Sequence, residues 1–180
     1  PRRMRNIIGT SKAKLIVYAD WKSQEVVIQG ALSKDQNIKA AIATGDPYLF
    51  TAKKAKAIPQ DAIRKDYETE RELYKQTYLA IGYGQTAIGL KAKLDISESE
   101  ASYLLSNLKR IYPTYFKWID GHIKFSVARG FFETKYGWRF YVSDKEKMNP
   151  RTLMNWPLQS HGSEILRRAL IDLDNRNFEI

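Results

Sequence analysis

The sequence contains no cysteine among its 180 residues. Disulfides, thiolate nucleophiles and zinc sites with cysteine ligands are therefore excluded. Histidine is also scarce, and His122 and His161 lie too far apart along the chain to form a helical histidine pair. We expect each of them to be an ordinary polar residue. Any metal ion that the chain binds should be a hard cation held by oxygen ligands.

Long apolar runs are missing as well. No segment approaches the roughly 18 consecutive apolar residues of a membrane span, and the basic start of the sequence lacks the apolar core of a signal peptide. Acidic residues are in deficit, because 30 lysines and arginines face 20 aspartates and glutamates, for a formal charge of +10. This excess favours a polyanionic partner, with nucleic acid first and an acidic membrane surface second. We expect no membrane insertion.

The segment RELYKQTYLAIGYG, residues 71–84, places different chemistries on one face of a predicted helix. Every fourth residue falls within a sector of about 120°. These residues are Arg71, Lys75, Leu79 and Tyr83. Two cations at one end could hold a chain of phosphates, and the aromatic ring at the other could stack on a base. Taken alone, the pattern also fits an amphipathic helix with a solvated basic edge.

A short run of β-branched and aromatic residues, 13–19, predicts a buried strand that ends at Asp20. A carboxylate at the end of a buried strand is well placed to hold a metal ion. Because a helix is predicted from Ser23 to Ser33, Asp20 could equally be the N-cap of that helix. The basic residues 1–12 are either a segment that lies over an acidic backbone or a solvated tail.

Further helices and one hairpin are predicted along the chain. Asp35 or Ser33 could cap a short helix, and the turn at 45–48 starts another, with Pro47 in its first turn. A capping box at 97–100 begins a helix that runs to about residue 111, and a further helix covers about 114–128. Two aromatic-rich runs around Tyr136-Gly137 predict a β-hairpin.

The last predicted helix begins after Asn149-Pro150 and carries Arg151, Asn155 and Gln159 four residues apart on one face. Amides on one face can donate to the minor-groove acceptors that every base pair presents. The simpler alternative is that these amides are merely exposed. The apolar face downstream, residues 165–173, is expected to be core.

In combination these segments resemble DNA polymerase family A, the polymerase I type of bacteria and phages. Residues 71–84 fill its motif B pattern, R-x3-K-x3-(F/Y/L)-x3-Y-G, without a gap. Residues 19–25, ADWKSQE, resemble motif A, D-Y-S-Q-I-E, although the middle of the segment departs from that pattern. Residues 129–141 resemble the family's R-G-Y-V-E-T-x-F-G-R-R-R-Y segment, and 151–162 resemble the segment that lies against the DNA minor groove.

The resemblance implies a catalytic role for three residues, Asp20, Arg71 and Lys75. Asp20 would bind both catalytic Mg²⁺ ions, with the backbone carbonyl of Trp21 as a further ligand of one of them. Arg71 and Lys75 would hold the triphosphate of the incoming nucleotide. Glu25 would help to exclude a ribose 2′-hydroxyl group.

It also implies further contacts to nucleotide and DNA. Tyr48 would touch the triphosphate, although its ring could instead pack under the start of a helix. Leu79 would pack against the incoming nucleoside, and Tyr83 would stack near the template base. The expected DNA-binding residues are Tyr83, Gly84, Arg151, Asn155 and Gln159.

The implied fold class is α+β and mostly helical, with the fingers and part of the palm of a right-hand polymerase. Residues 1–34 would form a palm segment with motif A, 35–112 the fingers with motif B, and 113–180 the return to the palm through a helix, a hairpin and the minor-groove helix. We expect the sequence to stop before motif C, which carries the second metal-binding aspartate. The two-ion Mg²⁺ site would then be only partly present, and the chain alone would polymerise little or not at all.

The implied function is template-directed DNA synthesis, the transfer of a dNTP to a primer 3′-hydroxyl in DNA replication or repair. Its partners would be primer-template DNA, a dNTP and the missing palm and thumb portion of the polymerase, and no membrane. The expected location is the cytoplasm of a bacterium or a phage-infected cell, with an organelle as an alternative. Two other readings stay open: a non-catalytic basic helical module that binds DNA, and a degenerate polymerase relative with a structural role.

Overall fold

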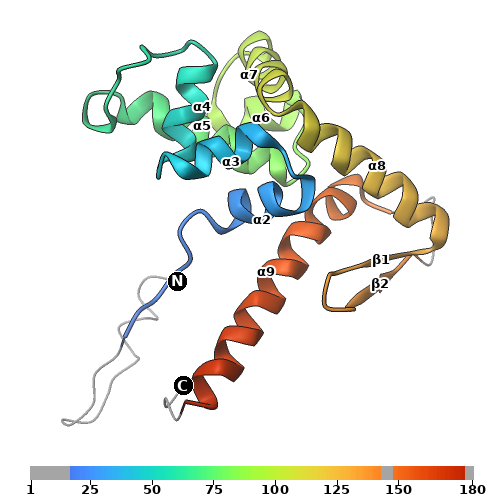
Figure 1. The fold of residues 1–180 in the computed structure, drawn as a ribbon. Coiled ribbons are helices and arrows are strands. Elements are labelled where there is room, and N and C mark those ends of the chain that lie inside the picture. The colour runs from blue at the N-terminus through green and yellow to red at the C-terminus, as the bar shows by residue number, and fades with distance from the viewer. Residues whose placement is uncertain (1–16, 143–147, 177–180) are drawn as a thin grey trace.

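The computed structural model describes residues 17–142 and 148–176. In chain order the elements are α2 (Gln24–Ser33), α3 (Gln36–Ala43), α4 (Pro47–Lys54), the 3₁₀ turn η1 (Arg64–Asp66), α5 (Glu68–Gly82), α6 (Ala87–Leu94), α7 (Glu98–Ile111), α8 (Pro113–Arg129), β1 (Phe131–Glu133), β2 (Arg139–Tyr141) and α9 (Pro150–Asp174). Helices α3 to α7 gather at one end, α8 leads away to the hairpin, and α9 returns to pack against α2 (Figure 1). The predicted fold class, mostly helical with a small β component, is confirmed.

Three buried tyrosines hold α4, α5 and the end of α7 together. The ring of Tyr78 packs edge-on against both Tyr48, at 6.0 Å between centroids, and Tyr112, at 5.5 Å. Such edge-to-face pairs add about 0.5–1.5 kcal/mol each beyond the burial of their surface. The hydroxyl groups of Tyr112 and Thr51 are hydrogen-bonded at 2.6 Å. Burial raises the pKa of Tyr78 and of Tyr112 well above the usual value, so both hydroxyls stay protonated.

The buried carboxylate of Asp35 caps two helices at once. Its Oδ1 atom accepts the backbone N–H groups of Asn37 and Ile38 at 2.9 and 3.1 Å, so the predicted cap of α3 is confirmed. Its Oδ2 atom accepts the N–H group of Tyr115, in the first turn of α8, at 3.0 Å. The first N–H groups of a helix have no partner within the helix and favour negative charge. One side chain therefore joins the beginnings of α3 and α8.

Local signals placed the other predicted boundaries correctly. Pro47 lies in the first turn of α4, and the capping box between Ser97 and Glu100 begins α7. Helix α8 starts at Pro113 and ends before Gly130, which has a left-handed φ of 86°. The predicted hairpin pairs β1 with β2 in antiparallel register, with Phe132 opposite Phe140.

Aromatic packing docks the hairpin onto α9. Phe132 is fully buried, and the Phe140 ring stacks on Trp156 of α9 at 5.8 Å. The hairpin is also hydrogen-bonded to α9, because His161 Nε2 accepts the backbone N–H group of Lys135 at 3.1 Å. The other ring nitrogen, Nδ1, is hydrogen-bonded to the carbonyl of Pro157 at 2.5 Å. Since Nε2 is the acceptor, Nδ1 carries the proton and donates to that carbonyl.

The predicted strand before Asp20 is wrong where it can be compared with the structure. Residues 17–19 belong to no strand, and Val17 is 83% exposed. A strand must pair its backbone with a neighbour, and within the described residues β1 and β2 pair only with each other. Residues 13–16, and the whole basic segment 1–12, lie outside the described residues. The alternative role of Asp20 as a helix cap is also wrong, because Ser23 precedes α2.

The predicted core face in the second half of α9 is likewise wrong for the part of the molecule described. Leu166 is 50% exposed, Ile171 56% and Leu173 40%. Helical periodicity identifies an apolar face but says nothing about what lies against it. In the described segments, no helix has both the length and the apolar character that a membrane span needs.

Candidate functional site

Three predicted site residues from distant parts of the chain meet in one hydrogen-bonded chain. The hydroxyl group of Tyr83, at the end of α5, donates to Glu25 Oε1 of α2 at 3.1 Å. In turn Gln159 of α9 donates its side-chain N–H to that same hydroxyl oxygen at 3.3 Å. Burial, followed by the negative charge of Glu25, raises the pKa of Tyr83, so the hydroxyl remains a neutral donor. The contact ties the end of α5 to both α2 and α9.

Gly84 lets the backbone of α9 approach the end of α5. It has a left-handed φ of 73°, and a Cβ atom placed there would lie 3.0 Å from the Cα atom of Arg151 and 3.4 Å from the Cβ atom of Met154. Backbone cannot move aside as the end of a flexible side chain can. A side chain at position 84 would therefore meet both conformational strain and a steric clash.

We expect Gly84→Ala to lower the free energy of unfolding by about 2 kcal/mol, because an L-residue in the left-handed region costs about 1–2 kcal/mol before the clash is counted. Chemical denaturation followed by circular dichroism would measure the change. Gly121→Ala is the matched control, because it lies within α8 and its Cβ would meet nothing within 4 Å. That control should be neutral or stabilising by up to about 1 kcal/mol, and equal effects of the two substitutions would contradict the prediction.

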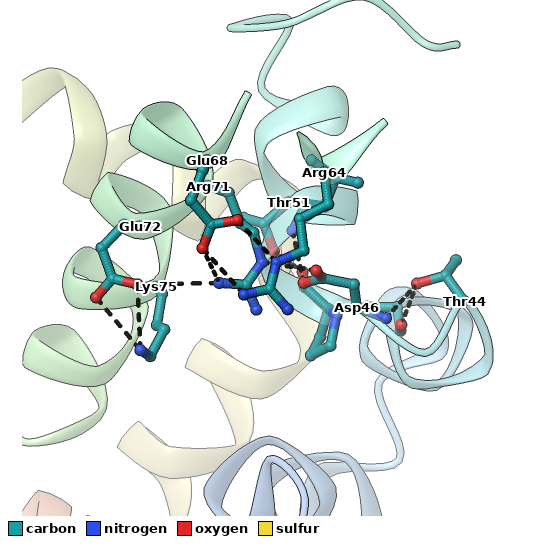
Figure 2. Close-up of polar contacts among 11 residues, drawn as sticks. Thr44, Asp46, Thr51, Arg64, Glu68, Arg71, Glu72 and Lys75 are labelled. Carbon is teal, nitrogen blue, oxygen red and sulfur yellow. Dashed lines mark hydrogen bonds and ion pairs between the residues drawn. The ribbon is translucent and has the colours of Figure 1, made fainter. Parts of the chain in front are cut away.

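Arg71 of α5 is held among carboxylates rather than presented to solvent. Its Nε atom donates to Asp46 Oδ2 at 2.6 Å, and its side chain is only 11% exposed. The Nη1 atom lies farther from two other acids, 3.5 Å from Glu68 and 3.9 Å from Glu72. Figure 2 shows these carboxylates arranged around the guanidinium group. Arg71, which was predicted to bind phosphate, is therefore surrounded by acidic side chains.

Lys75, one turn further along α5, is also paired. Its Nζ atom lies 3.1 and 3.3 Å from the two carboxylate oxygens of Glu72 (Figure 2). Both partners are more than one third exposed, and exposed pairs of this kind contribute about 0–1 kcal/mol. A more highly charged anion such as a triphosphate could therefore displace Glu72 from Lys75 at small cost.

Tyr48 and Leu79 are two further residues that the sequence predicted to contact the nucleotide. Tyr48 lies in the core and is only 6% exposed. The guanidinium carbon of Arg71 lies 5.6 Å from the centroid of its ring. Its ring thus packs at the start of α4, as the packing alternative expected. Burial is the main cause that raises the pKa of its hydroxyl. Leu79 is partly buried on the same helix as Arg71.

The residues expected to bind Mg²⁺ are exposed. Asp20 Oδ1 accepts the backbone N–H group of Trp21 at 2.9 Å, and Trp21 is 50% exposed. Nowhere in residues 17–142 and 148–176 do three histidine, aspartate or glutamate side chains come together in a way that could hold a metal ion. One carboxylate and one backbone carbonyl do not make a two-ion site, so these residues by themselves do not fit a pair of Mg²⁺ ions.

The remaining residues expected to bind DNA lie along α9. Arg151 is exposed in the first turn of α9. Gln159 is also exposed and donates a hydrogen bond to Tyr83. The side-chain oxygen of Asn155 is buried and accepts no hydrogen bond from the described residues. A buried acceptor needs a donor, so this oxygen does not itself favour contact with the acceptors of a DNA minor groove.

The sequence did not reveal the acidic partners of the two cations. Glu68 and Glu72 each precede a cation by three residues, a helical spacing that could have indicated the pairs. The pairing of Asp46 with Arg71 spans 25 residues and two elements, and it carries no local signal.

The family model described as DNA polymerase family A matches residues 1–179. DNA polymerase I of Pseudomonas aeruginosa is 25% identical over 97% of this chain and 20% of its own length. DNA polymerase I of Mycobacterium tuberculosis is 28% identical over 96% of this chain and 20% of its own length. The chain thus spans about a fifth of the length of these curated relatives.

A solved structure is similar over most of the chain. It is the POL domain of Pol1 from M. smegmatis in complex with DNA primer-template and dNTP. The TM-score is 0.77 and the sequence identity 25%, over 87% of this chain and 29% of that one.

Proposed function

The chain belongs to DNA polymerase family A, and we propose that it supplies the fingers and part of the palm of a DNA-directed DNA polymerase. The proposed reaction is transfer of a dNTP to the 3′-hydroxyl group of a primer. Its partners would be primer-template DNA, the dNTP and the polymerase segments that the chain does not span. The solved relative with primer-template and dNTP supports this choice of partners.

The observation that carries the proposal is the contact between Glu25, Tyr83 and Gln159. Motif A, motif B and the minor-groove segment supplied these residues independently, and their side chains meet although they are far apart in sequence. A non-catalytic basic module would have no need of a glutamate at this place, because a carboxylate repels phosphate. A shared site explains why all three patterns occur in one chain.

In the proposed site, Arg71 and Lys75 bind the triphosphate. Phosphate oxygens would take the place of the Glu68 carboxylate beside Arg71. They would likewise take the place of the Glu72 carboxylate beside Lys75. Leu79 would pack against the nucleoside, and Tyr83 would stack near the template base. Two neighbouring cations would stabilise the charge that builds up on the phosphates during transfer and would limit the freedom of the triphosphate to turn away.

Asn155 and Gln159 are proposed to monitor the primer-template. Their amides would donate to minor-groove acceptors, which occupy the same positions in every correct base pair. Gln159 donates to Tyr83 in the structure, so DNA would compete with Tyr83 for this amide. Arg151 and Gly84 would lie beside the same strand.

Asp20 and the carbonyl of Trp21 are proposed as ligands of Mg²⁺, the hard cation that oxygen ligands favour. Since the described residues do not complete a two-ion site, further carboxylates would have to come from other parts of the polymerase.

Primer extension by a chimeric polymerase would test the proposal. In this chimera the chain replaces the matching fifth of a bacterial DNA polymerase I, and the same polymerase with that segment deleted is the control. We expect extension by the chimera and none by the deletion. A folded chimera that does not extend primers would overturn the proposal. If it still bound DNA in a strongly salt-dependent way, a basic DNA-binding module or a degenerate relative would be favoured instead.

A further inference from the structure

The carboxylate of Asp46 has two separate partners, one for each oxygen. Its Oδ1 atom accepts the backbone N–H group of Leu49 at 3.2 Å and so caps α4. Its Oδ2 atom accepts the Nε–H group of Arg71 at 2.6 Å. Asp35, by comparison, uses both oxygens on backbone N–H groups. Capping α4 requires only one of the two oxygens of Asp46. The hydrogen bond between the second oxygen and Arg71 therefore needs another explanation.

The guanidinium group of Arg71 is held firmly on one edge and loosely on another. The short bond to Asp46 fixes the Nε edge, and both side chains are largely buried, 11% exposed for Arg71 and 20% for Asp46. The contacts of Nη1 with Glu68 and Glu72 are longer, at 3.5 and 3.9 Å, and these acids are 50% and 39% exposed. An incoming phosphate would therefore displace the contacts at Nη1 before the bond at Nε.

We propose that Asp46 is a positioning residue for nucleotide binding, which holds Arg71 by Nε so that the Nη1 edge is directed to the triphosphate. The ring of Tyr48, 5.6 Å from the guanidinium carbon, supports one face of the group. An arginine that is already fixed in a rigid fork loses little freedom when it binds phosphate. This inference rests on the proposed role of Arg71 in binding the triphosphate.

The test compares Asp46→Asn and Asp46→Ser in the chimeric polymerase. Both new residues cap helices well, so α4 keeps its N-cap, but neither provides a carboxylate for Nε. Single-turnover incorporation of a dNTP matched to the template would give its apparent Kd. We expect this Kd to rise about tenfold for each variant, within the range of couplings between contacting groups. Asp61→Asn, which neutralises an exposed carboxylate to which the proposal gives no role, is the control and should leave the Kd within about twofold.

A double-mutant cycle separates positioning from a general effect on the fold. In an Arg71→Ala background the substitution Asp46→Asn should change the Kd no further, because its target is gone. An equal effect in both backgrounds would assign Asp46 a merely structural role and overturn the inference. A Kd that is unchanged or lowered by Asp46→Asn and Asp46→Ser would overturn it too, while leaving the proposed function intact.

The two hypotheses fail in different ways. If Arg71→Ala itself leaves the Kd unchanged, the proposed role of Arg71 fails and the inference fails with it. If Arg71→Ala raises the Kd and the Asp46 variants do not, only the inference fails.

Discussion

Replacing Lys75 by alanine in the chimeric polymerase is expected to lower kcat/KM for the incoming dNTP about a hundredfold. Losses of about this size follow the removal of one hydrogen-bond donor that stabilises a developing negative charge. Lys75 shares a helical face with Arg71, and its partner in the structure is the exposed carboxylate of Glu72. Because that pair is weak, almost all of the attraction between Lys75 and a triphosphate is available for binding. Steady-state primer extension at varied dNTP concentration would measure the change.

Lys91→Ala is the matched control for this prediction. Lys91 is an exposed lysine in the last turn of α6, and the proposal gives it no role. Its removal lowers the net charge by the same amount, so a general electrostatic effect would appear in both variants. We expect the control to stay within about twofold of the parent, as surface charges have small effects. Similar losses in the two variants would refute a specific role for Lys75.

Asp35→Ala is expected to lower the free energy of unfolding by about 3 kcal/mol, because removing a buried hydrogen-bonded charge leaves its donors unsatisfied. The side chain is 2% exposed and accepts three backbone N–H groups, from Asn37, Ile38 and Tyr115. Two helices would lose a cap, and each cap is worth about 1 kcal/mol. Urea denaturation followed by circular dichroism would measure the loss.

Two further variants make this test specific. Asp35→Asn keeps one acceptor oxygen and should lose less than the alanine variant, since it can still cap one of the two helices. Asp61→Ala removes an exposed carboxylate from a loop and should change the stability by less than about 0.5 kcal/mol. A loss below about 1 kcal/mol for Asp35→Ala would contradict the double cap.

The elements that the sequence predicted correctly are those determined by neighbouring residues. The capping box at Ser97, the proline at the start of α8 and the left-handed Gly130 each act within one turn of the chain. Such interactions do not depend on the rest of the fold. For this reason most helices and the hairpin could be predicted without a structure.

The incorrect predictions concern contacts with distant partners. An apolar run at 13–19 and an apolar face at 165–173 both show a preference for burial, but the burial partner is not encoded locally. In the described residues Val17 and Leu166 remain exposed. Within the described residues, propensity alone thus overstated the extent of core.

The candidate site shows the same division. Spacing by four correctly placed Arg71 and Lys75 on one helix, and it grouped the residues of α9 in the same way. It could not indicate that Asp46 would hold Arg71, because that contact depends on how α4 packs against α5. The charge around Arg71, which affects how strongly it attracts phosphate, therefore depends on the fold as well as on the local spacing of acids along α5.

The packing of α2 against α9 also bears on how the chain folds. Helix α9 packs against α2, near the other end of the described chain (Figure 1). Gln24 donates to the carbonyl of Gly162 at 3.3 Å, and these two residues are 138 positions apart. Most other helices pack against neighbours in sequence, such as α4 against α5 and α6 against α7. Contacts between neighbours close short loops and form early, whereas a loop of this length must be closed against a larger loss of entropy. The helices between α2 and α9 can thus assemble before α2 and α9 meet. The hydrogen-bonded chain through Tyr83 would then be among the last of the described contacts to form.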